Sequence, residues 1–449
     1  MQYTDNQYKQ ATKIREIDAS VRFDIPVNPQ HPFYVDFSHV RGEFQEKVIY
    51  KALNVNPRDF TYTTSPFNKS LLFLGGMRGS GKTSELSKYT LNLDNPDCFF
   101  VVTCNIDNEL DLNDMEYMDI LIFQVEKLLQ KAKDNDLNID DEILVKLKNW
   151  FSERVHEINS YVRKEGGVDF GAEAKTPSLL LGILNITGRL KAGISVGKDN
   201  ATKIRNVFKQ RFNDFAQIFN NFIEEVNFIL RRDRIAKEVL FIIDGLEKTM
   251  SADTRKMIII DESNRLRQIK VNTIITLPIE LMSKRNILEQ FSTVASFPFV
   301  KIMEKDGQLR NQAIDKFKEF IFKRINENLF ESIEVVEKAI LFSGGSPREL
   351  LRILEYTNYF IEEDNTRIDL KSLDKALKKL SSQSVNYLTE EDFKKLKQIK
   401  ENNSQNKPVP FDETLQKLLE ELIVFEYNDG SYKRVNPIVE LSDAYKIYV

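Results

Sequence analysis

Short apolar runs recur along the chain between segments of helical periodicity. A short uninterrupted apolar run, bounded by turn residues or by helical segments, is typical of a strand that is buried on both faces. Strands of this kind, separated by helices, predict a parallel sheet covered on both faces and therefore an α/β fold. The runs that meet this description are 70–74, 98–103, 239–243 and 272–277.

The stretch between the second and third expected strands, about 108–235, is unusually long. Its apolar positions have mainly helical spacing, and we expect helices over 118–132 and 207–230. A patch rich in small residues, 166–197, interrupts this pattern and indicates no definite element. We therefore expect a helical insertion within the sheet domain.

From about residue 300 the pattern is helical up to a polar linker at 401–408. A further helix over 413–422 is followed by two short β runs on either side of Asp429-Gly430. Asp-Gly between alternating apolar runs is a strong hairpin signal, and a helix followed by a hairpin predicts a winged helix. The helices expected before the linker are 312–329, 332–342, 348–360 and 370–381.

These patterns divide the chain into four parts. We expect an N-terminal segment over 1–65 and a sheet domain over 66–300, which carries the helical insertion. A helical region over 301–385 and the winged helix over 386–449 complete the chain.

Composition limits the classes of protein that the chain can represent. Its 449 residues are 41% hydrophobic, which is enough for a sizeable core and too much for a disordered chain. Lys and Arg number 64 against 68 Asp and Glu, a net charge of −4, so nucleic acid or an anionic membrane would have to be bound by a local patch. The amino terminus lacks the apolar core of a secretory signal, and the longest apolar run outside the expected strands, 179–186, is too short to span a membrane. Cys98 and Cys104 lie in a strand-like run, where buried thiols are expected. We expect a soluble cytoplasmic protein without membrane contact.

The decisive motif follows the first expected strand and is a full match to G-x-x-x-x-G-K-[ST]. Glycines let the backbone curl so that successive N–H groups converge on a phosphate, and the helix that follows adds the positive end of its dipole. Lys82 would reach the β- and γ-phosphates, and the Thr83 hydroxyl would ligate Mg²⁺. A glycine-rich turn with a chance Lys-Thr pair is the alternative, but the strand before the motif and the helical pattern after it favour binding of ATP with Mg²⁺. The residues expected to bind the nucleotide here are Gly76, Met77, Arg78, Gly79, Ser80, Gly81, Lys82, Thr83 and Ser84.

A carboxylate ends the third expected strand, at Asp244. At the tip of a buried strand beside the phosphate loop it would hold Mg²⁺, directly or through water; an ordinary strand ending in an Asp-Gly turn is the alternative. Because Gly245 follows, no second carboxylate stands next to Asp244 to polarise water. Glu247 is the nearest candidate base, and a solvated loop carboxylate is the other interpretation.

Together these segments resemble the signal-transduction ATPases with numerous domains (the STAND class), which are relatives of the AAA+ initiator ATPases. The pairing of Gly-Ser-Gly-Lys-Thr with the apolar run ending Asp-Gly-Leu-Glu carries the resemblance. Residues 342–350 resemble the Gly-x-Pro-Arg sensor 2 element, and 40–43 resemble a short Arg-containing motif that packs near the adenine. The resemblance covers most of the chain apart from the helical insertion.

The resemblance implies a three-layer P-loop ATPase core, a helical lid that carries sensor 2, and a C-terminal winged helix. It implies that Arg41 lies near the adenine, that Pro347 and Arg348 meet the γ-phosphate, and that Thr276 takes the place of the polar sensor 1 residue. A plain strand threonine is the alternative for Thr276. An arginine finger to a neighbouring subunit's nucleotide could come from Arg265, Arg267 or Arg285. A solvated charged surface is the alternative for each of them.

The sensor segment has a structural interpretation as well. Ser346, Pro347 and Glu349 fit a capping box at the start of a helix. Arg348 does not fit it, because a cation at the positive end of a helix is mildly unfavourable. An anion bound there would resolve the conflict.

The sequence therefore predicts an ATP-binding, slowly hydrolysing STAND/AAA+-like switch that drives assembly or activation of a partner. Arg348 would couple the γ-phosphate to the position of the lid, and the missing carboxylate beside Asp244 favours a timer over a fast motor. ATP and ADP, a homo-oligomer or an effector protein are the expected partners, and a role in bacterial defence or signalling follows by analogy only. One alternative is an initiator or loader that binds DNA through Lys433 and Arg434 of the winged helix. The other is an assembly scaffold with negligible turnover.

Overall fold

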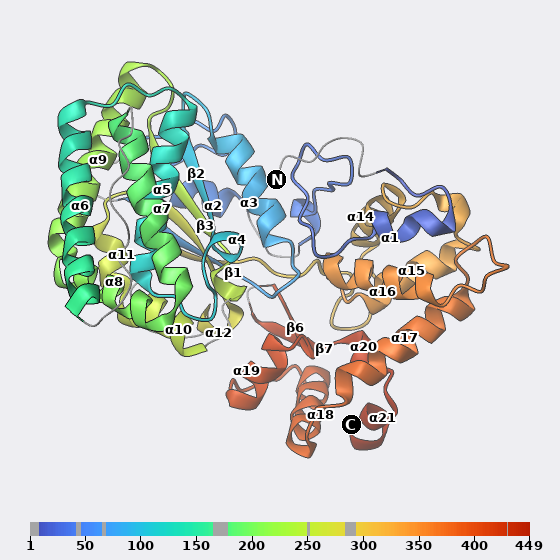
Figure 1. The fold of residues 1–449 in the computed structure, drawn as a ribbon. Coiled ribbons are helices and arrows are strands. Elements are labelled where there is room, and N and C mark those ends of the chain that lie inside the picture. The colour runs from blue at the N-terminus through green and yellow to red at the C-terminus, as the bar shows by residue number, and fades with distance from the viewer. Residues whose placement is uncertain are drawn as a thin grey trace.

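The computed structural model describes residues 9–41, 46–64, 69–164, 178–248, 252–282, 293–428 and 430–449. Its centre is a five-stranded parallel sheet in the order β2-β3-β4-β1-β5 (Figure 1). The four predicted strands are confirmed, and β5 is an addition, a run of only four residues that the sequence pattern does not distinguish from a loop. The strands are β1 (Leu71–Gly75), β2 (Phe99–Asn105), β3 (Glu238–Asp244), β4 (Asn272–Leu277) and β5 (Thr293–Ser296).

The two faces of this sheet are buried by different helices, as the uninterrupted apolar runs predict. Leu240 and Ile242 of β3 pack on one side with α3 (Lys82–Leu93) and α2 (Glu46–Ala52). Phe241 and Ile243 face the other side and pack against the insertion. This alternation gives the expected α/β architecture with three layers, and the order of strands, with the phosphate loop after β1, is that of a AAA+-like P-loop fold.

The helical insertion is present as a block of long helices beside the sheet (Figure 1). The small-residue patch is helical from residue 179, and its first part, 166–177, lies outside the described residues. Shorter elements follow or connect the strands: α4 (Ile106–Glu109), η3 (Leu246–Lys248), α10 (Ala252–Lys256), η4 (Met257–Asp261), α11 (Ser263–Gln268) and α12 (Ile279–Met282). The long helices of the insertion are α5 (Tyr117–Asp134), α6 (Asp141–Lys164), α7 (Leu179–Val196), α8 (Lys198–Gln210) and α9 (Phe212–Arg232).

A second hydrophobic core lies in the helical region 301–385, which we call the lid. It is on the other side of the molecule from the insertion (Figure 1). The N-terminal segment contributes to this core through Ala11, Ile17 and Phe37, although it is separated from the lid by more than half the chain. Its own elements are η1 (Ile14–Glu16), α1 (Ile17–Ser20) and η2 (Ser38–Val40). The elements of the lid are α14 (Asn311–Phe322), η5 (Glu327–Leu329), α15 (Ile333–Phe342), α16 (Pro347–Tyr359) and α17 (Leu370–Val385).

The C-terminal unit, residues 386–449, contains the predicted helix and hairpin. A third core holds it together and extends to Met77 of the phosphate loop and Phe299. None of the described helices is long and apolar enough to cross a membrane. The elements of the C-terminal unit are α18 (Glu390–Ser404), α19 (Glu413–Glu420), β6 (Val424–Tyr427), β7 (Tyr432–Val435), α20 (Pro437–Glu440) and α21 (Asp443–Tyr448).

Candidate nucleotide-binding site

The phosphate loop joins β1 to α3, where the sequence motif predicts it. Gly79 has φ +83°, and a Cβ there would lie 3.0 Å from side-chain carbons of Arg348, so this position requires glycine. Lys82, only 4% exposed, curls over the loop and donates to the carbonyl oxygens of Gly76 at 2.8 Å and Met77 at 3.0 Å. The loop backbone and the start of α3 thus surround a buried ammonium group, an arrangement suited to phosphate.

The two predicted metal ligands are brought together. The hydroxyl of Thr83, in the first turn of α3, donates to Asp244 Oδ2 at 2.7 Å. The second carboxylate oxygen, Oδ1, is buried and has no hydrogen-bond partner. Burial, and then the charge of Glu247, raises the pKa of Asp244 to about 6, and a cation bound at this carboxylate would oppose that shift by stabilising the charged form. A carboxylate and a hydroxyl beside a phosphate loop are the oxygen ligands that Mg²⁺ takes in nucleotide sites, and the residues present fit this ion.

Glu247 lies on η3, directly after β3, and points at the same loop. Its Oε1 is 3.6 Å from the Lys82 ammonium, and its side chain is 8% exposed, so the interpretation as a solvated loop carboxylate is wrong. Burial acts to raise its pKa, but the charge of Lys82 and a hydrogen bond with Thr276 outweigh burial and hold the pKa below its usual value. Oε2 is buried without a partner. The group is therefore an ionised carboxylate with one oxygen available to accept from water.

Thr276 ends β4, the strand next to β3. It is fully buried, and its hydroxyl accepts from the Gly245 N–H at 3.0 Å and bonds to Glu247. The threonine therefore fixes the turn between Asp244 and Glu247 instead of serving only as a strand residue.

The predicted sensor segment starts α16. Ser346 is its N-cap, accepting from the Glu349 N–H at 3.3 Å, and Pro347 takes the first helical position. The Ser346 hydroxyl also donates to the Gly79 carbonyl at 3.4 Å, which ties the lid to the phosphate loop. Arg348 runs along Gly79 and places its guanidinium 5.4 Å from the ring of Phe23. Burial, and then the neighbouring charge of Arg78, lowers its pKa, as expected of cations gathered where an anion binds.

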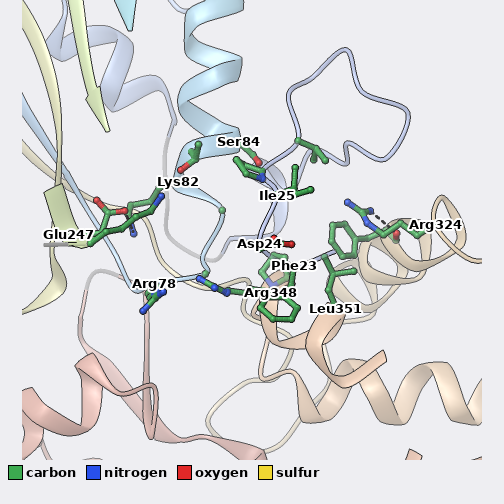
Figure 2. A pocket seen from close by; sticks show the side chains of 18 residues that line it. Phe23, Asp24, Ile25, Arg78, Lys82, Ser84, Glu247, Arg324, Arg348 and Leu351 are labelled. Carbon is green, nitrogen blue, oxygen red and sulfur yellow. Dashed lines mark hydrogen bonds and ion pairs between the residues drawn. The ribbon is translucent and has the colours of Figure 1, made fainter. Parts of the chain in front are cut away.

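A pocket opens between the loop, the lid and the N-terminal segment. Figure 2 shows Lys82 and Glu247 at one end and Arg324 and Leu351 at the other, with Phe23 and Arg348 between them. The end away from Lys82 is largely apolar, which suits a purine base. The lining residues that sequence analysis missed are Phe23, Asp24, Ile25, Pro26, Val27, Lys248, Phe320, Arg324 and Leu351. Phe23, Ile25 and Val27 alternate with Asp24 and Pro26 in the sequence, but this short pattern gives no sign of its contact with the phosphate loop.

Arg324 closes the far end of this pocket. It is 3% exposed, and it donates to the carbonyl oxygens of Phe33 at 2.9 Å and Phe320 at 3.0 Å. Its guanidinium lies 3.7 Å from the Phe320 ring, and burial lowers its pKa to about 9. The side chain therefore joins the N-terminal segment to the lid.

Several predicted residues lie outside the pocket lining. Arg41 is buried behind the phosphate loop. Its guanidinium lies 3.9 Å from the Phe297 ring and donates to the Pro298 carbonyl at 2.8 Å. It therefore packs against the loop and does not line the base end of the pocket. Met77 points into the core of the C-terminal unit. Arg265 lies over the Phe212 ring at 4.7 Å, within the insertion. Arg267 does not line the pocket either, and Arg285 lies outside the described residues.

The chain was compared with known proteins. No protein-family model matches it, and no curated protein does. Among solved structures, it is similar to the Walker-type ATPase PABY2304 of Pyrococcus abyssi, with 12% identity and a TM-score of 0.41 over 93% of this chain and 98% of that one. It is also similar to Cdc6p from Pyrobaculum aerophilum (12% identity, TM-score 0.35, 93% and 97% covered). The Aeropyrum pernix ORC1 protein, solved in complex with DNA, matches with 10% identity and a TM-score of 0.35, over 96% and 97%. The fold assignment rests on the strand order and the phosphate loop of the chain itself.

Proposed function

We propose that the chain binds ATP with Mg²⁺ and hydrolyses it slowly, as a switch that sets the position of the lid and the C-terminal unit. The observation that carries this proposal is the meeting of Lys82, the Thr83–Asp244 hydrogen bond and Glu247 at one end of a pocket whose other walls belong to the lid and the N-terminal segment. Nucleotide bound there would touch all three parts of the chain at once.

Each residue has a defined task in this proposal. Lys82 would leave the loop carbonyls for the β- and γ-phosphates. The Thr83 hydroxyl and Asp244 would hold Mg²⁺, and the ion when bound would supply positive charge against the phosphate oxygens. Glu247 accepts a hydrogen bond from the attacking water and orients it. Arg348 contacts the γ-phosphate and, because it starts α16, transmits the loss of that phosphate to the lid.

The phosphate loop is also fastened to the C-terminal unit. The Glu426 N–H of β6 donates to Met77 Sδ at 3.0 Å, and the Tyr427 hydroxyl donates to the Gly344 carbonyl, just before sensor 2, at 2.6 Å. The hairpin therefore touches both the loop and the lid segment that would contact the triphosphate in this proposal. These contacts support a switch in which the hydrolysis state alters how firmly the C-terminal unit is held.

The test separates binding from turnover. Lys82→Ala should lose nucleotide affinity, measured with a fluorescent ATP analogue, whereas Glu247→Gln should bind ATP and lose most hydrolysis, about 100-fold on the scale of a missing general base.

Hydrogen exchange of β6 and β7 should differ between the ATP-bound Glu247→Gln variant and the ADP-bound wild type. Full turnover in Glu247→Gln would contradict its role as base. Exchange that is identical in the two states would contradict the switch and leave the scaffold alternative.

The DNA-binding alternative rests on side chains that are already paired. Lys433 lies 3.0 Å from Glu426 and donates to the Gly430 carbonyl at 2.6 Å, while Arg434 lies 3.7 Å from Glu440. DNA would have to displace these partners, and we therefore rank this function second. Salt-sensitive binding of duplex DNA that Lys433→Ala/Arg434→Ala abolishes would reverse that ranking. The effector partner, the homo-oligomer and the role in defence or signalling remain hypotheses from the resemblance.

A further inference from the structure

One cation that lines the triphosphate end of the pocket has no role in the mechanism above. Lys248 follows Glu247 on η3, lines the pocket with Lys82 and Thr83, and has a side chain that is 33% exposed. Its ammonium pairs with Oδ2 of Asp107, in α4 after β2. Asp107 in turn lies against the Asp244–Glu247 turn, since a Cβ on Gly245 would be 3.1 Å from its backbone nitrogen.

The pair therefore stands at the carboxyl edge of the sheet, next to both carboxylates proposed to act on the nucleotide. The charge of Lys248 opposes the rise in the pKa of Asp244 that burial and Glu247 cause, and adds to the effect of Lys82 on the pKa of Glu247, so it reaches both groups. Because its side chain is partly exposed and flexible, rotation can carry the ammonium from Asp107 into the pocket that it already lines.

We propose that Lys248 is a catalytic residue that contacts the terminal phosphate in cis, supplying from the same chain the charge that an arginine finger would bring from a neighbour. In the step it assists, a water oxygen bonds to the γ-phosphorus and the bond from phosphorus to the β–γ bridging oxygen breaks. ADP leaves with the electron pair, and the water proton passes to Glu247. Negative charge grows on the oxygens of the transferred group, and a nearby ammonium stabilises it.

The first test compares binding and hydrolysis in the full chain. Lys248→Met should lower the single-turnover rate of MgATP hydrolysis by roughly 100-fold, the scale of removing one preorganised charge-stabilising donor, while affinity for a fluorescent ATP analogue changes far less. Lys248→Arg, which keeps the charge, should recover much of the rate. A rate in Lys248→Met within about twofold of wild type would overturn the proposal.

Two controls exclude a merely structural role. Lys237 and Asp97 also form a pair, 3.7 Å apart, but they lie just before β3 and β2, at the opposite end of these strands from Lys248 and Asp107. Lys237→Met should therefore leave the rate unchanged. If the Lys248–Asp107 pair only braced η3 against α4, Asp107→Asn and Lys248→Met should slow hydrolysis equally. We expect the lysine variant to be much the slower, and equal effects would overturn the proposal.

A mixing experiment distinguishes cis from trans action and does not depend on a single variant. Lys248→Met binds ATP without the proposed cation, and Lys82→Ala carries the cation without binding ATP. Mixed together they should remain inactive if Lys248 acts in cis; restored hydrolysis would overturn the proposal.

The inference rests on the proposed function, but the two fail differently. If wild type neither binds nor hydrolyses ATP, the function itself is wrong, whereas normal wild-type turnover with an unaffected Lys248→Met removes this inference alone.

Discussion

Buried oxygen atoms without a donor gather where β2 and β3 end. In the described part of the chain they include one oxygen each of Asn105, Asp107, Asp244 and Glu247. An acceptor left unpaired in the interior costs about 1–3 kcal/mol. Four of them at one edge of a sheet therefore indicate a surface built to receive a cation and hydrogen-bond donors, which is the chemistry that MgATP and water provide.

The Thr83 hydroxyl should matter only when metal is present. Thr83→Val keeps the shape of the side chain and removes the oxygen, so we expect Mg²⁺ to strengthen ATP binding roughly tenfold less than in wild type, the scale of one charge-assisted bond. Titration with a fluorescent nucleotide, in Mg²⁺ and in EDTA, measures this ratio.

The matched variant Ser87→Ala removes a hydroxyl from the next turn of α3, where it donates to the Thr83 carbonyl, and should leave the ratio unchanged. Equal Mg²⁺ effects in wild type and Thr83→Val would show that the hydroxyl does not ligate the metal.

How far the site could be predicted depends on the distance in sequence between its parts. The phosphate loop is one continuous motif, and Asp244 needs only a strand that ends in a carboxylate. The contact of Thr276 with Glu247 requires β4 beside β3, which no single segment specifies. Phe23 meets Arg348 across more than 300 positions, so nothing local at either residue indicates the contact.

At the scale of elements, the insertion is the largest departure from a plain sheet domain. Within it, Arg205 of α8 is 2% exposed and pairs with Asp119 of α5 at 2.7 Å and with Asp114, just before α5, at 2.9 Å. Burial acts to raise the pKa of Asp119, and Arg205 opposes that shift. The pair fixes how α8 sits on α5. Sequence periodicity predicted helices here but not their neighbours, because amphipathic helices of similar length can pack in several orders.

Removing one partner of this pair should be costly. Arg205→Met leaves a buried carboxylate without its counter-ion, and we expect a loss of about 3–5 kcal/mol in the free energy of unfolding. Chemical denaturation measures the loss, and Arg205→Met/Asp119→Leu should recover much of it. Lys146→Met serves as the control, because its pair with Glu142 is exposed on α6 and should contribute less than about 0.5 kcal/mol. A loss in Arg205→Met no larger than in the control would contradict the assignment.

At the scale of the whole molecule, the C-terminal unit is held at the junction of sheet domain and lid (Figure 1). Phe425 of β6 packs against Phe299 at 4.8 Å between ring centres. The same ring lies under Gly344, where a Cβ would come within 2.5 Å of it. The docking of the C-terminal unit therefore requires a residue without a side chain at position 344 of the lid.

Gly344→Ala should release the hairpin. The new methyl group collides with Phe425, so we expect faster hydrogen exchange in β6 and β7 and a larger radius of gyration in solution scattering.

Gly307→Ala is the matched control for this prediction. Gly307 also has a positive φ, +90° against +58°, but a Cβ there meets no atom within 4 Å. Both variants carry backbone strain, and only Gly344→Ala adds a collision. Undocking in both would attribute the effect to strain, and undocking in neither would contradict the proposed contact.

The walls of the pocket are supplied by residues 23–27 near the start of the chain and by Phe320, Arg324 and Leu351 far beyond the sheet. During synthesis the sheet strands leave the ribosome well before α16 does. A nascent chain can therefore fold its phosphate loop while the wall supplied by Phe320, Arg324 and Leu351 is still missing. We therefore expect ATP to stabilise the nascent sheet domain less than it stabilises the complete chain. On the proposed function, nucleotide could act on the lid only after the lid has been made.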